Sequence, residues 1–555
     1  MRMEEWDGKR RTADMTGATS NQSSATDTLK FGTGGLRGTL GDGPGHMNAL
    51  VVARATQGLA NYLRKRFDAP SVAICRDSRH CSDEFARRTA EVLAGNGIRA
   101  LLFPRVEPTP ALSFAVRELG CSAGVVITAS HNPKEYNGYK VYGADGCQIT
   151  VAAAAEIQDE INAVGPDSVQ AVAYEEGVES GLIGLTPDEV LDRYCDAVLA
   201  QSTGIDCSGL RVAYTPLNGT GLELVSRTLA GIGVTDLHVV PEQAEPNGDF
   251  PTCPKPNPEE PAALELGVAL GQRVGADVLL ATDPDADRVG VAVPHDGEWK
   301  LLTGNELGLL LLDFLASCAE ASGEDMSRRV AVTTIVSAPM ADDLARAHGL
   351  ELRRTLTGFK FCGEQIGILE SQGRESDFLF GLEESYGYLA GTYARDKDAV
   401  VSCVLACELA AHWKERGLDL WEAMRALYDR YGHWGNEQVS VAYEGEDGAE
   451  RMAAVMDALR SEPLAELGGL AVDSVIDYAP GAPMPVVNPL PGSPAQVLPP
   501  SNVLEWRLAG GSRVLVRPSG TEPKVKAYVF AKGETSEEAE GLLAKLVREV
   551  RGLLL

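Results

Sequence analysis

The sequence lacks any continuous apolar run that approaches the roughly 18 residues a membrane-spanning helix requires. Residues 1–30 contain arginine and lysine but no apolar core segment, so we do not interpret them as a secretory signal. Their content of Ser, Thr, Asp and Asn is typical of a mobile tail. We therefore expect a cytoplasmic protein that has no membrane partner.

The pattern of cysteines also lacks the spacing of a disulfide framework or a zinc ribbon. The chain has 11 cysteines, which is an odd number, and no two have C-x-x-C spacing. Cys403 and Cys407 lie one helical turn apart, and we interpret them as packing residues. This usage is typical of a protein from a reducing cytoplasm.

Positive charge is scarce in this chain. It has 50 Lys and Arg against 79 Asp and Glu, which gives a formal net charge of -29 at pH 7. Such an excess of negative charge repels nucleic acid and anionic membranes, so we expect neither as a partner. It would also repel a phosphorylated small molecule. Any phosphate site must therefore be a local group of arginines and lysines.

The chain does contain a repeated alternation of strand and helix patterns. Its 555 residues and 44% hydrophobic content suffice for roughly three to five domains. Three rounds of the alternation begin after residue 31, near Leu210 and near Thr303, and such rounds are typical of doubly wound α/β sheets. The pattern changes after about Tyr431, and a proline-dense stretch at 480–500 indicates an irregular connection.

The most informative loop follows the β-branched run at 125–127, which predicts a buried strand that ends before an Asn-Pro turn. Ser130 is thus predicted at the C-terminal end of a strand, where ligands bind in open α/β sheets. With His131 and Lys140 close in sequence, its hydroxyl could act as a covalent nucleophile for an anionic group. The alternative is that Ser130 only caps a helix or a turn.

Three aspartates alternate along a second loop, again after a predicted strand. Asp283, Asp285 and Asp287 could converge on one hard cation, and the small number of ligands favours Mg²⁺. An EF-hand is excluded, because Arg288 stands where the loop needs glycine and Pro294 where it needs glutamate. A solvated acidic turn is the alternative.

Two further stretches combine cations with glycine or hydroxyl groups. Residues 31–38 form a glycine-rich loop that contains Arg37, and exposed N–H groups in such a loop can approach phosphate oxygens. The loop is not a Walker A motif, because no Gly-Lys-Ser/Thr follows. Near the C-terminus, a plausible phosphate cup comprises Arg517, Ser519, Gly520 and Thr521. A plain turn is the alternative for both.

A carboxylate and a hydroxyl lie two residues apart after the strand predicted at 378–380. Glu383 and Ser385 could bind two neighbouring sugar hydroxyls. By itself the pair is not specific, because the same spacing is common where a helix N-terminus is capped.

The loop around Ser130 resembles the phosphoserine loop of the α-D-phosphohexomutases, the family of phosphoglucomutases and phosphomannomutases. The resemblance rests on Thr128-Ala129-Ser130-His131-Asn132-Pro133, with Tyr136-Asn137-Gly138 and Lys140. Four other stretches resemble the family's remaining loops: residues 31–38, the acidic loop, the stretch with Glu383 and Ser385, and the C-terminal phosphate cup. They follow one another along the chain in the order that the family shows. The acidic loop departs from the common D-G-D-G-D-R form at Pro284 and Ala286, which are both spacer positions.

The resemblance implies a role for each candidate residue. Ser130 carries the phosphoryl group, Arg37 faces it, and either His131 or Lys140 acts as general base or acid, a choice that the sequence leaves open. One Mg²⁺ per chain is held by Ser130, Asp283, Asp285 and Asp287. The substrate is bound by Arg288, Thr357, Gly358, Glu383, Ser385, Lys397, Arg517, Ser519, Gly520 and Thr521.

The family's architecture is implied as well. It is α/β, with three similar doubly wound α/β domains plus a smaller C-terminal α+β domain around a central cleft. We place the mobile tail at 1–30, domain I with the phosphoserine loop at 31–200 and domain II with the metal loop at 201–302. Domain III with the sugar-binding loop follows at 303–430, and domain IV with the phosphate-binding loop at 431–555.

The implied activity is that of a phosphosugar mutase, which interconverts sugar 1- and 6-phosphates through a phosphoserine enzyme and a bisphosphate intermediate. Glucose is the favoured sugar, with mannose or a pentose 1-/5-phosphate as alternatives, and sugar 1,6-bisphosphate is the expected activator. The loops look closest to the branch with phosphopentomutase and bacterial phosphoglucomutases. We expect a monomer or homodimer whose partner is a small phosphosugar. Other possible functions are a sugar-bisphosphate synthase or phosphatase, and a non-catalytic sugar-phosphate sensor.

Overall fold

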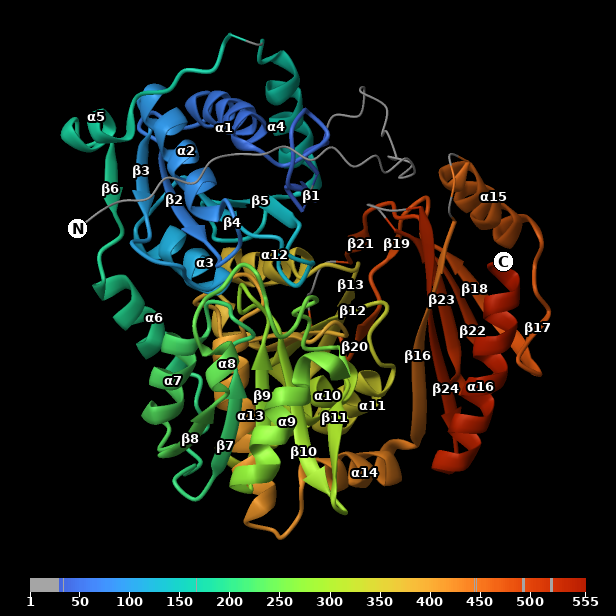
Figure 1. Cartoon of the computed structure of the whole chain (residues 1–555). Helices are drawn as coiled ribbons and strands as arrows, with labels where there is room; N and C mark the ends of the chain where they lie inside the picture. Colours follow the sequence, from blue (N-terminus) through green and yellow to red (C-terminus); the bar gives the residue numbers. More distant parts are fainter. Residues whose placement is uncertain are drawn as a thin grey trace, which may run out of the picture.

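The computed structural model describes residues 29–32, 34–165, 167–443, 445, 447–491, 495–519 and 523–555. Of the tail predicted at 1–30, only Leu29 and Lys30 fall within these ranges, and the Leu29 amide donates a hydrogen bond to the Pro44 carbonyl at 2.9 Å. Figure 1 shows the chain arranged in four parts that follow one another in sequence. Within the described ranges, no helix has both the length and the apolar character needed to cross a membrane.

The first part contains a sheet with the strand order β1-β5-β4-β2-β3-β6. Strands β4, β2, β3 and β6 are parallel, whereas β5 is antiparallel to both of its neighbours. The strands are β1 (Leu36–Thr39), β2 (Ser71–Arg76), β3 (Arg99–Leu102), β4 (Ala123–Ile127), β5 (Tyr136–Gly143) and β6 (Ile183–Leu185). The helices are α1 (Ala49–Arg64), α2 (Ser82–Gly95), α3 (Thr109–Glu118), α4 (Val151–Ala163), α5 (Tyr174–Glu179) and α6 (Glu189–Leu199).

The second part repeats this arrangement with the strand order β11-β10-β9-β7-β8. Strands β7, β8 and β9 are parallel, and β10 is antiparallel to β9 and β11. The strands are β7 (Arg211–Thr215), β8 (Asp236–Val239), β9 (Val278–Thr282), β10 (Val289–His295) and β11 (Glu298–Leu302). The helices are α7 (Leu222–Gly231), α8 (Pro241–Ala244) and α9 (Pro261–Val274).

The third part has the strand order β15-β14-β12-β13-β20, again with an antiparallel strand, β15, beside β14. Its strands are β12 (Val330–Thr334), β13 (Glu351–Thr355), β14 (Phe378–Glu383), β15 (Gly387–Ala390) and β20 (Val486–Val487). Its helices are α10 (Gly304–Ala321), η1 (Met326–Arg328), α11 (Met340–His348), α12 (Lys360–Ser371), η2 (Glu375–Asp377), α13 (Ala399–Lys414) and α14 (Leu420–Tyr431). Cys403 and Cys407 on α13 are fully buried, which confirms the prediction that they are packing residues.

Each of these three sheets is therefore mixed and not purely parallel. The physical reason is the short connection after β4, β9 and β14, because a connection between parallel strands needs a crossover of about a dozen residues or more. The three equivalent hairpins carry Ser130, the three aspartates of the acidic loop, and the pair Glu383 and Ser385. One apolar core runs through all three parts and contains Val126, Leu280 and Phe380 from the strands that lead into these hairpins.

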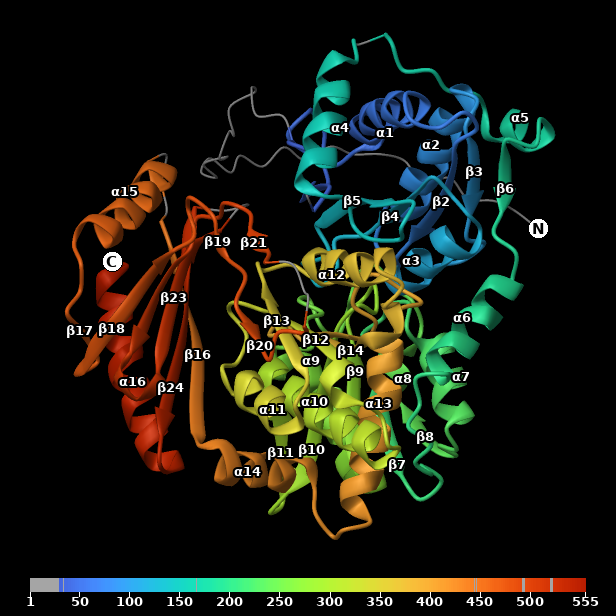
Figure 2. The ribbon, with the colours of Figure 1, turned by 180° about the vertical axis from the view of Figure 1, so that it is seen from behind.

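The fourth part is an antiparallel sheet with the order β16-β24-β23-β22-β18-β17, and α16 lies across one of its faces (Figure 2). Its strands are β16 (His433–Ala442), β17 (Glu466–Leu467), β18 (Leu470–Asp477), β22 (Leu504–Leu508), β23 (Arg513–Pro518) and β24 (Lys524–Gly533), and its helices are α15 (Gly448–Ser461), η3 (Ala509–Gly511) and α16 (Ser536–Leu553). Leu546 and Val550 of α16 are buried against the sheet, as their helical spacing predicts.

The proline-dense stretch returns from the fourth part to the third. It contains two strands that pair with each other, β19 (Ala482–Pro483) and β21 (Val497–Leu498), and between them β20, which pairs with β13 of the third sheet. Three α/β parts and a smaller α+β part confirm the predicted fold class.

Candidate active site

Ser130 lies in the hairpin connection between β4 and β5. Its φ of 53° is in the left-handed region, which costs a residue with a Cβ roughly 1–2 kcal/mol. The Thr128 hydroxyl accepts a hydrogen bond from the Ser130 amide at 2.8 Å and so holds the turn. Ser130 is only 3% exposed. A buried serine in a strained conformation indicates that the fold fixes this hydroxyl for a function beyond packing.

The Ser130 hydroxyl contacts two groups that bear on its reactivity. Oγ donates a hydrogen bond to Asp283 Oδ2 at 2.8 Å and lies 3.1 Å from Nδ1 of His131. Burial, together with the positive charges of Arg288 and Arg37, lowers the pKa of His131 well below its ordinary value. The imidazole is therefore neutral near pH 7 and can accept a proton.

The three aspartates meet in the β9–β10 hairpin. One carboxylate oxygen from each of Asp283, Asp285 and Asp287 lies within 4.8 Å of the others, and all three side chains are buried. Oδ1 of Asp283 accepts hydrogen bonds from the amides of Asp287 at 3.1 Å and Arg288 at 3.0 Å. Burial and the two neighbouring carboxylates raise the pKa of Asp283 well above its ordinary value. So much buried negative charge requires positive partners.

Two lysines from other parts of the chain face these aspartates. Lys140 on β5 donates a hydrogen bond to Asp285 Oδ2 at 2.9 Å, and Nζ of Lys397 lies 3.2 Å from Asp287 Oδ2. Burial by itself would raise the pKa of Asp285, but the Lys140 ammonium group holds it well below its ordinary value. Burial opposes the charge of Lys397, yet Asp287 and Asp396 raise its pKa above the ordinary value, so this lysine is positively charged.

The acidic hairpin fits a hard divalent cation. Two of its buried carboxylate oxygens, Asp285 Oδ1 and Asp287 Oδ1, have no hydrogen-bond partner among the described residues. Leaving such atoms unsatisfied is costly, and carboxylate oxygens are the ligands that Mg²⁺ prefers. Ser130 Oγ lies beside this group through its contact with Asp283. The three aspartates could therefore hold a metal ion.

The candidates for binding the sugar lie in two loops. Glu383 and Ser385 belong to the β14–β15 hairpin, and Thr357 and Gly358 belong to the turn after β13. Glu383 is the last residue of β14, and Ser385 follows in the turn. Oε1 of Glu383 accepts a hydrogen bond from the Gly358 amide at 3.2 Å, which joins the two loops. Thr357 Oγ1 is buried and has no partner in the described part of the chain. Burial raises the pKa of Glu383 to about 7.

Two arginines belong to this region: Arg37 lies on β1, and Arg288 is the last residue of the β9–β10 connection. Arg37 on β1 stands opposite Gly138 of β5, and its Nη1 donates a hydrogen bond to Asn132 Oδ1 at 3.3 Å, so its guanidinium lies beside the Ser130 loop. Nη1 of Arg288 donates to Glu259. Its buried Nε has no hydrogen-bond partner among the described residues and remains able to donate to a ligand.

The predicted phosphate cup follows β23 in the fourth part. Arg517 donates from Nη2 to the Tyr528 hydroxyl at 3.1 Å and stands opposite Lys526 on β24. The Ser519 amide donates to the Lys524 carbonyl at 2.7 Å, so the chain turns back at this point. Gly520 and Thr521 lie outside the described residues.

Comparison with known proteins decides the family. The chain matches the alpha/beta/alpha domains I, II and III of phosphoglucomutase/phosphomannomutase at residues 28–168, 192–297 and 303–431, and the C-terminal domain of the same proteins at 464–549. This chain belongs to the phosphoglucomutase/phosphomannomutase family. It is therefore an enzyme of the mutase class, an isomerase that works by intramolecular phosphoryl transfer.

Individual members of the family are similar over nearly the whole chain. A phosphoglucomutase of Staphylococcus saprophyticus is 35% identical over 515 residues, which cover 92% of each chain. A Haemophilus influenzae protein named "Probable phosphomannomutase" is also 35% identical, over 92% of this chain and 98% of its own. The crystal structure of the phosphoglucomutase parafusin from Paramecium shares the fold, with a TM-score of 0.68, 18% identity and 95% of both chains covered.

Four residues around the mutase site were not predicted from the sequence. Thr109 donates from Oγ1 to Asp285 Oδ2 at 2.9 Å, Asp396 lies 3.2 Å from the Lys397 ammonium group, and Glu259 holds Arg288. The fourth, Arg79, lies beneath the Ser130 loop. Only Arg79 has a sequence pattern that could have drawn attention, because Asp77 and Arg79 directly follow the β2 strand.

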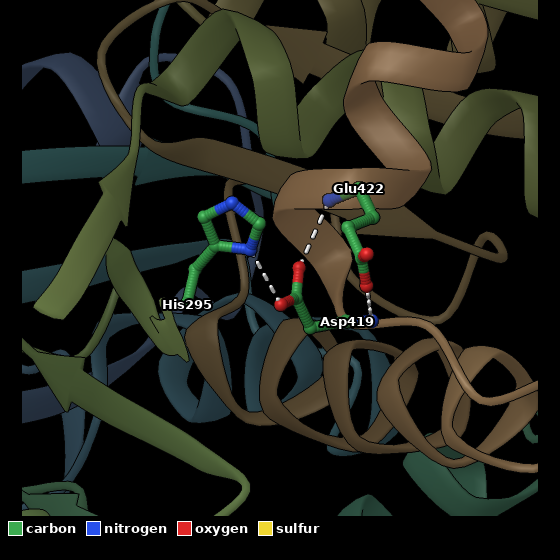
Figure 3. Close-up of side chains that lie close together, drawn as sticks. All are labelled: His295, Asp419 and Glu422. Carbon is green, nitrogen blue, oxygen red and sulfur yellow. Dashed lines mark hydrogen bonds and ion pairs between the residues drawn. The ribbon is translucent and has the colours of Figure 1, made fainter. Parts of the chain in front are cut away.

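A second group of potential metal ligands lies at the other end of β10, where His295 lies close to Asp419, the N-cap residue of α14, and to Glu422 in the first turn of that helix (Figure 3). Asp419 Oδ1 accepts a hydrogen bond from the Glu422 amide at 2.9 Å, and Glu422 Oε2 accepts one from the Asp419 amide at 3.0 Å. Asp419 Oδ2 lies 2.9 Å from His295 Nδ1. These contacts form a capping box at the N-terminus of α14, with His295 bound to the cap residue. Helix capping is therefore sufficient to explain why the three side chains lie together.

Proposed function

We propose that this enzyme interconverts glucose 1-phosphate and glucose 6-phosphate, with Ser130 as the carrier of the phosphoryl group. The contacts of Ser130 Oγ with Asp283 and His131 support the role of Ser130, and the acidic hairpin supports a requirement for Mg²⁺. The names of the Staphylococcus relatives, which are 35% to 36% identical, favour glucose as the sugar. The Haemophilus relative makes mannose the second sugar to test.

In the proposed cycle, phosphorylated Ser130 donates its phosphoryl group to the free hydroxyl of the bound sugar phosphate. The bond between phosphorus and Ser130 Oγ breaks and Oγ takes up a proton, while a bond between phosphorus and the sugar oxygen forms and the proton of the sugar hydroxyl passes to a base. The product is a sugar 1,6-bisphosphate, which turns round in the site. Ser130 Oγ then bonds to the opposite phosphoryl group and gives its proton to a base, while the bond between that phosphorus and the sugar oxygen breaks and the sugar oxygen takes up a proton. The numbers of phosphates and protons are therefore unchanged over the cycle.

His131 is the base that the geometry supports best for Ser130. Its Nδ1 lies 3.1 Å from Oγ, and its lowered pKa keeps the ring ready to accept the proton. Lys140 is held by Asp285, and we assign it, with Arg37, to stabilising negative charge on the phosphoryl group. A Mg²⁺ bound by Ser130, Asp283, Asp285 and Asp287 would neutralise charge on the transferring group.

We assign the two ends of the substrate to different parts of the chain. The sugar hydroxyls bind Glu383 and Ser385, beside the loop that contains Thr357 and Gly358. The phosphate that is not transferred binds the cup of the fourth part. The residues of this cup are Arg517, Ser519, Gly520 and Thr521, with Arg288 and Lys397 completing the cationic surroundings.

One observation carries the proposal, namely that the strained Ser130 places its hydroxyl 2.8 Å from Asp283 of the acidic hairpin. The test is incubation with radiolabelled glucose 1,6-bisphosphate and Mg²⁺, followed by proteolysis and mapping of the label. We expect the label on the peptide that contains Ser130, and neither label nor isomerase activity in Ser130→Ala. Ser376→Ala, a change of an exposed serine, is the control and should retain both. Isomerisation by enzyme that carries no label at Ser130 would overturn the proposal.

The same preparation separates the other two functions. A mutase gives net isomerisation that catalytic amounts of glucose 1,6-bisphosphate stimulate, whereas a bisphosphate synthase or phosphatase accumulates bisphosphate or inorganic phosphate. A sensor would bind sugar phosphate equally well after Ser130→Ala and turn over none. A coupled assay across the 1-phosphates of glucose, mannose, ribose and deoxyribose then ranks the sugars.

A further inference from the structure

Arg79 lies in the loop that follows β2 and is only 3% exposed. Its guanidinium group faces the inner side of the Ser130 loop and donates to four backbone carbonyls of that loop. Nη1 donates to Pro133 at 2.8 Å and Tyr136 at 3.1 Å, and Nη2 donates to Ser130 at 2.6 Å and also to Asn132. A single side chain therefore satisfies the carbonyl of Ser130 itself and of three residues that follow it.

We infer that Arg79 is a positioning residue for the reaction, an inference that rests on the proposed role of Ser130. It touches no reacting atom. By binding the carbonyl groups on both sides of the turn, it fixes the backbone that holds Ser130 at a φ of 53° and aims Oγ at Asp283. Without it, four carbonyls would lose a donor, and the turn would be free to relax from its strained conformation.

The arginine is itself held from two sides. Its Nε lies 3.2 Å from Asp77 Oδ2, and its amide donates to Asp77 Oδ1 at 2.9 Å. From the second part of the chain, the ring of Phe250 lies 5.1 Å from the guanidinium carbon. Gly248 packs so closely that an added Cβ would lie 2.7 Å from the Ser78 carbonyl oxygen. The orientation of Arg79 therefore depends on the packing of the second part against the first.

Lysine cannot replace this arginine. The guanidinium group presents its N–H donors in a rigid planar fork, and here the fork spans acceptors that lie along a whole turn. An ammonium group has three donors at a single point and would reach only one end of the turn. The variant Arg79→Lys therefore keeps the buried charge while removing most of the restraint on Ser130.

The experiment compares Arg79→Lys and Arg79→Ala with Arg353→Lys as the matched control. Arg353 is equally buried, at 3% exposure, but it binds Glu351 and Gln365 in the third part, away from the Ser130 loop. The readouts are the melting temperature, kcat and KM for glucose 1-phosphate, and the rate of label transfer to Ser130 from radiolabelled glucose 1,6-bisphosphate. Wild-type enzyme is measured in parallel.

We expect Arg79→Lys to lower kcat and the rate of label transfer about 100-fold, because a misplacement of about 1 Å can cost that much, while KM changes less than about threefold. Millimolar guanidinium should restore Arg79→Ala at least about tenfold, whereas methylammonium should not, because only the former reproduces the fork. Arg353→Lys should lower the melting temperature and leave kcat within about threefold.

Label transfer at the wild-type rate in Arg79→Lys would overturn the inference, and so would a loss of kcat that merely parallels the folded fraction, as in the control. If the Arg79 variants do not fold, Asp77→Asn tests the same restraint with a side chain of equal size, and unchanged label transfer in that variant also overturns it. An unlabelled wild-type enzyme would instead defeat the proposed role of Ser130, so the two failures are distinguishable.

Discussion

The hydroxyl of Ser130 and the carboxylate of Asp283 are 2.8 Å apart, although 153 positions separate them in the chain. They lie in equivalent hairpins of two successive α/β parts, β4–β5 and β9–β10. The third equivalent hairpin, β14–β15, carries Glu383. One topological feature, repeated three times, thus supplies the three loops on which the proposed chemistry depends.

The strained backbone at Ser130 leads to a prediction about stability. Glycine adopts positive φ without the steric cost of a Cβ, so Ser130→Gly should be more stable than Ser130→Ala by up to about 1 kcal/mol, once the greater freedom of glycine in the unfolded chain is subtracted. Both variants should lose mutase activity by at least about 1000-fold. Urea denaturation and a coupled assay check the two statements. If Ser130→Gly were less stable than Ser130→Ala by the roughly 0.5–1 kcal/mol that glycine costs at ordinary positions, the turn would not be strained.

The charges around the acidic hairpin lead to a prediction about metal affinity. Lys397 lies 3.2 Å from Asp287 and therefore competes with a dication for the same carboxylate. Lys397→Met should bind Mn²⁺ about threefold to tenfold more tightly, since like-charge repulsion at this range is worth about 1 kcal/mol even in water. Asp287→Asn should bind it at least about tenfold more weakly. The spectrum of free Mn²⁺ measured by electron paramagnetic resonance reports both without reference to activity.

The matched control for this prediction is Lys414→Met. Lys414 also pairs with an aspartate, Asp277, at 2.7 Å, but it lies on the surface outside the acidic hairpin. Its loss should leave Mn²⁺ affinity unchanged. Weaker binding of Mn²⁺ by Lys397→Met would mean that this lysine supports the metal site, contrary to the electrostatic argument.

Buried Glu383 leads to a prediction about pH. Burial raises its pKa from 4.5 to about 7, so between these pH values the folded state binds a proton that the unfolded state has lost. Stability contributed by this group is therefore present below about pH 4.5, falls as the pH rises toward 7, and is constant above it. Glu383→Gln does not titrate, and its stability relative to wild type should rise across this window by at most about 3 kcal/mol.

Urea denaturation midpoints at several pH values between 4.5 and 8 test this expectation. Glu537→Gln, a change of an exposed carboxylate on α16, serves as the control for the general effect of removing a glutamate. A difference between Glu383→Gln and wild type that stays constant over the whole range would contradict the raised pKa of Glu383.

The sequence predicted the strands that lead into the three hairpins, because a β-branched or apolar run followed by turn residues constrains local structure strongly. It also predicted the acidic loop as a cation site from the spacing of three carboxylates. It did not predict the antiparallel strands β5, β10 and β15, because period-two patterns carry no information about strand direction.

Contacts between distant positions were beyond sequence reasoning for a different reason. Arg79 recognises backbone carbonyls, which every residue possesses, so nothing in the residue types of the Ser130 loop indicates its partner. Thr109 reaches Asp285 across 176 positions, and an isolated threonine at the start of a helix has many ordinary roles. Only the resemblance to a known family brought Ser130, Asp283 and Arg517 into one predicted site.

Arg517 carries the final prediction, which tests whether the fourth part binds the phosphate that is not transferred. Its side chain is held by Tyr528 and stands opposite Lys526, whose pKa is lowered by burial and by the nearby charges of Arg517 and Lys524. Cations that crowd together in an acidic protein favour an anionic ligand. Arg517→Ala should raise KM for glucose 1-phosphate by about 10- to 100-fold, the value of one or two charge-assisted hydrogen bonds.

Two further variants serve as comparisons for Arg517→Ala. Tyr528→Phe removes the hydroxyl that orients Arg517 and should raise KM only about threefold, because the charge remains in place. Arg507→Ala, on the neighbouring strand β22, removes an arginine that pairs with Glu505 instead, and should leave KM unchanged. If Arg517→Ala retained the wild-type KM, the second phosphate would have to bind elsewhere. The cations Arg288 and Lys397 beside the acidic hairpin would then be the next candidates, and the bisphosphate would have to turn round without help from the fourth part.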